Sequence, residues 1–112
     1  MTSHEKDINR GFSAISQSLK QNIDMNIYIK MIISKLRFAL MLRYAPYTEN
    51  YIKGLVKESD LLYLKDLIKD KPEYITSQTL SLLLNAYQEV RNAVISSLPL
   101  EITLIKIFNA EK

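Results

Sequence analysis

The sequence contains no cysteine, no tryptophan and only one histidine among its 112 residues. Without cysteine the chain can form no disulfide, thiolate metal site or cysteine nucleophile. A zinc site would have to be built around one histidine, and a Ser-His-Asp arrangement would depend on the same residue, His4, in a predicted tail. These absences argue against the common metal sites and nucleophilic hydrolases, and we expect no cofactor.

Glycine and proline are also scarce, with two and three residues respectively. Neither Gly11 nor Gly54 opens a GxxxxGK[ST] segment, so the sequence lacks a phosphate-binding loop and ATP hydrolysis by this chain alone is not expected. The scarcity of both residues favours long helices with short connections. Gly11 should weaken its helix by about 1 kcal/mol relative to alanine, unless it permits the close approach of a neighbour.

Apolar residues recur at spacings of three and four along nearly the whole chain, and no strand pattern competes with them. We therefore predict an all-α fold, a compact bundle of five to six helices in a single domain over residues 1–112, with residues 1–6 frayed. The first two predicted helices cover 7–22, with Asp7 as cap, and 24–45, with Asn22 or Asp24 as cap. A short helix follows Thr48, and another helix runs from Ser59 to Pro72. The last two begin at Thr76, with an apolar stripe as far as Val94, and cover 97–108, with Ser96 or Ser97 as cap.

The segment 24–45 is the most distinctive of these helices, because it is apolar on most of its circumference and stops at Pro46. Lys30, Lys35 and Arg37 lie at its centre, where each charge costs about 2.5 to 3.5 kcal/mol inside a bilayer. We therefore expect no membrane span. Residues 1–10 lack the apolar stretch of a signal peptide, so we expect a soluble, cytoplasmic protein. We also expect other helices to cover the segment 24–45 on nearly every side.

The segment 97–108 is also too apolar for a simple surface helix, so both segments carry apolar surface that a subunit contact could use. A buried helix in a monomer explains 24–45 equally well. The charge distribution leaves the same two alternatives open. Residues 1–57 carry a net charge of +5 and residues 58–112 a net charge of −2, which could promote head-to-tail association or be chance.

The helix after Thr76 has a polar face that can be interpreted in two ways. Its polar residues carry no charge, so they could contact a partner or simply face solvent: Ser81, Asn85, Gln88 and Asn92.

The alternative function is a small basic domain that binds nucleic acid. Its candidate contacts are Lys30, Arg37, Arg43 and Lys53. Their dispersion argues against a single reading face. Three nearby tyrosines could stack on single-stranded bases, or could be core edges whose hydroxyls reach water: Tyr44, Tyr47 and Tyr51.

The segment Ser97-Leu98-Pro99-Leu100-Glu101, followed by Ile102, Leu104 and Ile105, resembles the LPLELALIEL-type helix of one bacterial family. That helix lies near the end of the third, collar domain of the DNA polymerase III gamma/tau subunit. Upstream, Lys35-Leu36-Arg37 followed by Ala39-Leu40-Met41-Leu42 is similar to an LR pair and leucine run in the same domain. The likeness could extend over residues 8–108.

The resemblance implies an all-helical, non-catalytic assembly module that joins clamp-loader subunits during DNA replication. Its partners would be other clamp-loader subunits or copies of itself. The family's nucleotide-binding motif, zinc-binding segment and sensor residues have no counterpart here, so the chain would be the oligomerisation part of a larger ATPase subunit. The candidate subunit contacts are Leu36, Leu40, Leu98, Pro99, Leu100, Glu101 and Leu104.

Overall fold

The computed structural model describes residues 3–109, and the side chains of residues 6–109. This part of the chain contains six α-helices, three short 3-10 helices and no strand, which confirms the predicted all-α bundle. In chain order the elements are α1 (Ser3–Lys20), α2 (Met25–Tyr44), η1 (Pro46–Thr48), α3 (Glu49–Lys53), α4 (Glu58–Asp70), η2 (Pro72–Tyr74), α5 (Ser77–Glu89), η3 (Val90–Asn92) and α6 (Leu98–Phe108). The side chain of His4 lies outside the described part.

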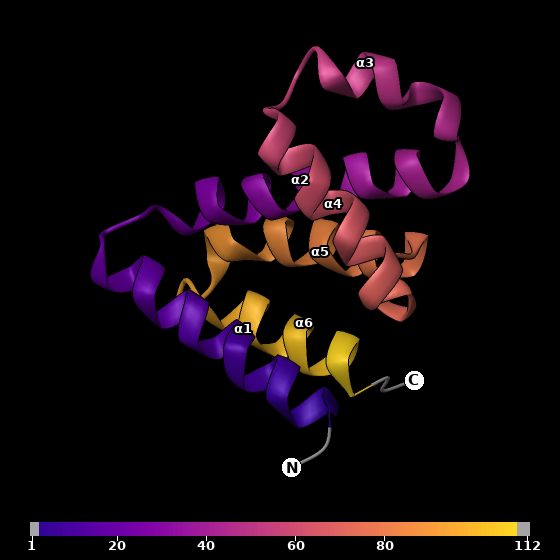
Figure 1. Cartoon of the computed structure of the whole chain (residues 1–112). Coiled ribbons are helices and arrows are strands. Elements are labelled where there is room, and N and C mark those ends of the chain that lie inside the picture. Colours follow the sequence, from indigo (N-terminus) through magenta and orange to yellow (C-terminus); the bar gives the residue numbers. More distant parts are fainter. Residues whose placement is uncertain (1–2, 110–112) are drawn as a thin grey trace.

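The helices form two groups that share α2 (Figure 1). In the first group, which we call the four-helix layer, α1, α6, α5 and α2 lie side by side in that order. In the second group, the α3–α4 end, α4 crosses α2 while η1 and α3 pack near the end of α2. The first and last helices of the chain are therefore neighbours, although they are far apart in the sequence.

The connection between α1 and α2 is specified locally. Asn22 has a φ of 59°, and asparagine is one of the few residues other than glycine that tolerates this left-handed conformation. The amides of Asn22 and Ile23 donate to the carbonyls of Leu19 and Ser18 over 3.1 and 3.0 Å, the two bonds of a Schellman motif. Asp24 then caps α2 by accepting from the amides of Asn26 and Ile27, so of the two predicted caps Asp24 is the one used.

The start of α1 differs from the prediction. The helix already begins at Ser3, so the predicted frayed tail is wrong for residues 3–6, while Met1 and Thr2 lie outside the described residues. Asp7 is therefore not a cap but a buried residue inside the helix, only 8% exposed. Gly11 lies on the side of α1 that meets α6, where a Cβ atom would come within 2.7 Å of Leu104 Cδ1. The glycine thus permits the close approach that could justify its cost to the helix.

Packing covers α2 on fewer sides than predicted. Its buried residues are Met25, Ile29, Leu36, Ala39 and Leu42. The opposite face is open: Ile27 and Met31 are more than half exposed, and Lys30 and Arg37 reach solvent. Lys35 lies nearer the packed side and is exposed as well. The prediction of cover on nearly every side was wrong because α4 and α5 pack on only part of the circumference.

Two later helix boundaries also differ from the sequence prediction. The N-cap of α4 is Lys57 rather than Ser59, so Glu58 and Asp60 lie in the first turn, where negative charge is favourable. The chain leaves α5 at Glu89, and Val94 is 99% exposed instead of ending an apolar stripe. The predicted Thr76 cap is confirmed, since its hydroxyl accepts from the amide of Thr79 at 3.2 Å.

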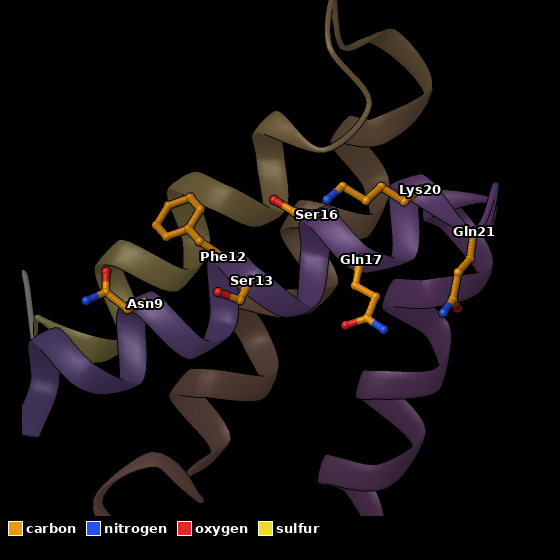
Figure 2. Close-up of a pocket in the computed structure, with 7 residues that line it drawn as sticks. All are labelled: Asn9, Phe12, Ser13, Ser16, Gln17, Lys20 and Gln21. Atoms are coloured by element: carbon orange, nitrogen blue, oxygen red, sulfur yellow. The ribbon is translucent and has the colours of Figure 1, made fainter.

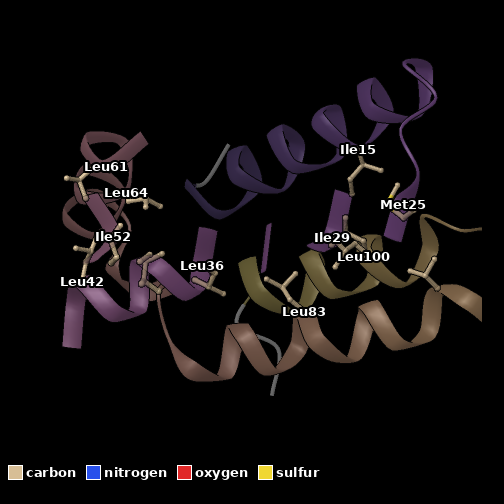
Figure 3. Close-up of a cluster of buried hydrophobic side chains, with 13 residues drawn as sticks. Ile15, Met25, Ile29, Leu36, Leu42, Ile52, Leu61, Leu64, Leu83 and Leu100 are labelled. Carbon is tan, nitrogen blue, oxygen red and sulfur yellow. The ribbon is translucent and has the colours of Figure 1, made fainter. Parts of the chain in front are cut away.

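The buried core extends along α2 and links both groups of helices (Figure 3). At one end Ile15, Ile29 and Leu100 come together from α1, α2 and α6. At the other end Leu42 packs near Ile52 of α3 and the buried leucines of α4. Each of the two groups therefore depends on one half of α2 for its hydrophobic packing.

Candidate functional site

The candidate subunit contacts fall into three classes of exposure. Leu36, Pro99 and Leu100 are buried within this chain, and Leu100 is completely inaccessible. Leu40, Glu101 and Leu104 are half-buried, whereas Leu98 is 39% exposed. The three buried residues are corrections to the predicted contact set, because side chains that fill the monomer core cannot also meet a partner. Of the whole set, Leu98 is the residue most accessible to a second protein.

The LPLE segment has a clear role inside the monomer. It forms the first turn of α6, where Pro99 is tolerated because its missing amide proton has no helical acceptor. Ser97 occupies the N-cap position but makes no capping bond to the backbone; its hydroxyl instead donates to Glu101 Oε2 over 3.1 Å. Helix initiation and burial of Leu100 thus account for this segment without any partner.

The uncharged face predicted on the helix after Thr76 is exposed, and at its η3 end Gln88 and Asn92 adjoin apolar residues of α6. Together they form what we call the α5–α6 surface: Ser81, Leu84, Asn85, Gln88, Asn92, Val94, Leu98 and Ile102. The end of this surface near η3 is hollowed by an open depression of about 420 Å³, whose lining includes Gln88, Leu98 and Ile102. Ile102 is 45% exposed and Leu84 is 44% exposed. The sequence identified the polar half of this surface; its apolar half depends on how α6 packs.

The four basic residues of the nucleic-acid alternative do not form one patch. Lys30 and Arg37 are exposed on α2, whereas Lys53 pairs with Glu49 over 3.4 Å. Arg43 is only partly exposed, and its guanidinium donates to the carbonyls of Pro72 and Ile75. We therefore remove Arg43 from the candidate contacts, because it is used to hold η2 against α2.

The three tyrosines near the end of α2 are more exposed than core-edge residues would be. Tyr47 is 87% exposed, Tyr44 is 65% exposed and Tyr51 is 57% exposed. The guanidinium of Arg43 lies 5.1 Å from the centroid of the Tyr44 ring, within range of a cation–π interaction. Aromatic rings in this position could stack on an unpaired base, although they also occur on ordinary surfaces.

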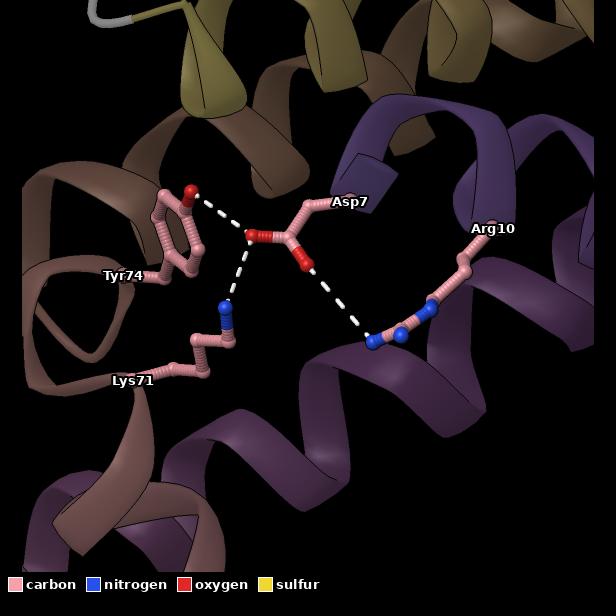
Figure 4. Close-up of polar contacts among 4 residues, drawn as sticks. All are labelled: Asp7, Arg10, Lys71 and Tyr74. Atoms are coloured by element: carbon pink, nitrogen blue, oxygen red, sulfur yellow. Dashed lines mark hydrogen bonds and ion pairs between the residues drawn. The ribbon is translucent and has the colours of Figure 1, made fainter. Parts of the chain in front are cut away.

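A buried carboxylate joins α1 to the segment around η2 (Figure 4). Asp7 Oδ2 accepts from Lys71 Nζ over 3.2 Å and from the Tyr74 hydroxyl over 3.0 Å, while Arg10 lies 3.9 Å from Oδ1. Burial, followed by the bond to Asp7, raises the pKa of Tyr74 to about 12. A tyrosine held in its neutral form and already bonded is poorly suited to proton transfer at neutral pH. We assign this group, the Asp7 cluster, a structural role.

A wide surface depression along α1 is polar and shallow. It has a volume of about 720 Å³, and all seven residues that line it belong to α1 and the turn after it: Asn9, Phe12, Ser13, Ser16, Gln17, Lys20 and Gln21 (Figure 2). A site with walls from one helix cannot enclose a ligand, because nothing faces the bound molecule from the other side. We do not treat it as a functional site.

A smaller hollow differs because several helices form it. It has a volume of about 360 Å³ and we call it the central groove. Its lining residues are Ile32, Lys35, Leu36, Tyr63, Leu67, Tyr74, Ile75, Thr79, Leu83, Leu104, Ile107 and Phe108. They come from α2, α4, α5, α6 and the η2 segment. Ten of these twelve residues are aliphatic or aromatic, so the groove can bury apolar atoms.

Among residues 6–109, whose side chains the structure describes, no group of three acidic side chains is arranged to hold a metal ion. No described helix is long and apolar enough to cross a membrane. The chain matches no family model, no curated protein and no solved structure in three separate comparisons. The features of the chain that bear on its function are therefore its exposed surfaces and the resemblance of the LPLE segment.

Proposed function

We propose that the chain is a non-catalytic assembly module that associates with copies of itself or with related helical subunits through the α5–α6 surface. The observation that carries this proposal is the composition of that surface: large apolar side chains lie beside uncharged polar ones over two neighbouring helices. Depletion of charge is typical of the buried centre of protein interfaces. Among the described residues that line the depression on this surface, Glu89 is the one that carries a charge.

The particular assembly we propose is the collar of a DNA polymerase III clamp loader, which would place the chain in DNA replication in the cytoplasm. Support comes from the LPLE segment, which resembles the family's helix and which begins α6 in this chain. The same segment also serves monomer packing, so this part of the proposal needs a direct test.

Sedimentation of purified protein at increasing concentration tests the association. We expect the apparent mass to rise with concentration for the natural sequence, and the Ile102→Glu variant to remain monomeric because it places a charge within the contact. A matched control is Leu62→Glu on α4, since Leu62 is 56% exposed and lies away from this surface. Strictly monomeric behaviour at high concentration, combined with no complex in the next experiment, would contradict the assembly proposal.

The clamp-loader assignment is tested by mixing the chain with purified bacterial clamp-loader subunits and following complex formation by size-exclusion chromatography. We expect a complex that the Ile102→Glu variant does not form. Self-association without any such complex would retain the assembly module and remove the clamp loader from the proposal.

A second candidate function is binding of single-stranded nucleic acid, and the exposed rings of Tyr44, Tyr47 and Tyr51 favour it. Titration of fluorescently labelled single-stranded DNA at two salt concentrations tests this function, because phosphate contacts weaken steeply as salt rises. If the rings stack on bases, Tyr47→Ala should weaken binding by about 1 to 3 kcal/mol. Absence of binding at low salt would remove the second candidate.

A further inference from the structure

The central groove combines enclosure with an apolar lining. Six aliphatic side chains from four helices form its walls: Ile32, Leu36, Leu67, Leu83, Leu104 and Ile107. Two of them, Leu36 of α2 and Leu83 of α5, are labelled in Figure 3. Its volume of about 360 Å³ lies near the lower end of the range of about 300 to 1,000 Å³ that is usual for small-ligand pockets. One alkyl chain fits such a volume better than the paired chains of a membrane lipid.

The charges around the groove have one sign. Among the residues that the structure describes, Lys35 is the only charged one that lines the groove, and no carboxylate of the described part does so. Its ammonium group is exposed and forms no ion pair or hydrogen bond with the described residues. The groove therefore presents one available positive charge beside an apolar interior.

The other polar groups of the groove are already used or lie at its edge. The Tyr74 hydroxyl donates to Asp7, and the Thr79 hydroxyl lies 3.1 Å from that of Thr76. Tyr63 is 59% exposed, so its hydroxyl can remain in water. The deeper part of the groove thus offers little to a polar ligand, since buried polar atoms without partners are costly.

We propose that the central groove binds a single-chain anionic amphiphile, such as a medium-chain fatty acid. The alkyl chain lies against the aliphatic walls and the carboxylate pairs with Lys35 at the rim. Burial of the chain provides most of the affinity, because each methylene removed from water is worth about 0.8 kcal/mol. The ion pair at Lys35 selects an anionic head group and contributes less, because it remains exposed to solvent.

Calorimetric titration of the whole chain with dodecanoate, below its micelle concentration, tests this proposal. We expect one molecule bound per chain. Dodecyltrimethylammonium carries the same alkyl chain with the opposite charge and should bind more weakly. Lys35→Gln should lower the affinity for dodecanoate about fivefold, equivalent to the ~1 kcal/mol of an exposed ion pair. The matched control is Lys30→Gln, which removes an exposed charge from α2 outside the groove and should leave the affinity unchanged.

A second variant tests the position of the alkyl chain. Leu67→Trp fills the groove from α4 and should abolish binding while the far-ultraviolet circular dichroism stays helical. If this variant fails to fold, the comparison of Lys35→Gln with Lys30→Gln still decides. Equal binding of the two amphiphiles, equal losses in the two lysine variants, or no binding up to the solubility limit would each overturn the proposal. A protein dimer that Leu67→Trp dissociates would overturn it too, because a second copy would then occupy the groove.

Discussion

The two ends of the molecule are each held together by a carboxylate, but in different surroundings. What we call the α1–α6 end is the place where α1, the end of α6 and the η2 segment meet. There Asp7 of α1 is 9% exposed at its side chain and binds Lys71 and Tyr74 at 3.2 and 3.0 Å. At the α3–α4 end, Glu49 is 33% exposed at its side chain and meets Lys65 at 2.8 Å. The exposed pair is shorter, yet water screens it and the buried cluster is screened much less. The contribution of these contacts to stability therefore follows their burial and not their distance alone.

The two ends also differ in how closely neighbouring atoms approach the backbone at their glycines, and the α1–α6 end is again the more tightly packed. Gly11 lies against α6, where an added Cβ would meet Leu104 at 2.7 Å. Gly54 lies at the end of α3, where an added Cβ would have only a backbone oxygen of Tyr51 at 3.5 Å. The α1–α6 end should therefore respond strongly to substitution, and the α3–α4 end should tolerate it.

The largest effect is expected from Asp7→Ala. Removing a buried, charged acceptor should lower the free energy of unfolding by about 1.5 to 3 kcal/mol, the range for hydrogen bonds to charged groups. Urea denaturation followed by circular dichroism measures this loss. A loss that shrinks markedly in 1 M salt would contradict the assignment of a buried cluster, because such a cluster is poorly screened.

A slightly smaller loss is expected from Gly11→Leu. The larger side chain must displace Leu104 and separate α1 from α6, and overpacking of this kind costs about 1 to 3 kcal/mol. The control is Gly54→Ala, which should stabilise the protein by about 0.4 to 1 kcal/mol because it restricts the unfolded chain. Thermal denaturation of both variants makes the comparison, and equal effects at the two glycines would contradict the difference in packing.

The third prediction concerns alkaline pH. The pKa of Tyr74 is raised from 10.0 to about 12, so between these values the folded protein retains a proton that the unfolded chain has lost. Its contribution to stability is therefore complete below pH 10 and declines as the pH rises. Tyr74→Phe should reduce this decline without removing it, because burial also raises the pKa of Tyr28. An unchanged slope in the variant, measured by urea denaturation from pH 9 to 11.5, would disprove the role of Tyr74.

The smallest effect is expected from Glu49→Gln. The ammonium groups of Lys65 and Lys53 lower the pKa of Glu49, so the pair stabilises the fold above the ordinary pKa of glutamate and the benefit is lost as the pH falls. Since both partners are exposed, the urea midpoint should change far less than for Asp7→Ala. A loss as large as that of Asp7→Ala would reverse the proposed ranking of the two ends.

Local signals in the sequence located much of the fold. Asp24 and Thr76 are helix caps, and Pro46 and Pro72 follow the ends of α2 and α4. Asn22 permits the turn between α1 and α2. Each of these residues acts on the backbone conformation or hydrogen bonds of its own position or of residues close to it in the sequence. The buried residues Ile15, Ile29 and Leu83 belong to the apolar residues whose spacing of three and four predicted helices. The errors at Asp7, Ser59 and Val94 are errors of boundary or role, where several residues had similar propensities and distant contacts decided between them.

The candidate sites likewise depend partly on local sequence signals and partly on contacts between distant residues. Composition and interactions within a few residues account for the all-α fold, for the uncharged face of α5, and for the lack of cysteine and glycine-rich chemistry. Packing between distant helices, by contrast, buries Leu100 while Leu98 stays exposed, uses Arg43 to hold η2, and places Lys35 beside an apolar groove. Each of these depends on a helix from a distant part of the sequence, and helical periodicity states which residues share a face but not which helix will cover it.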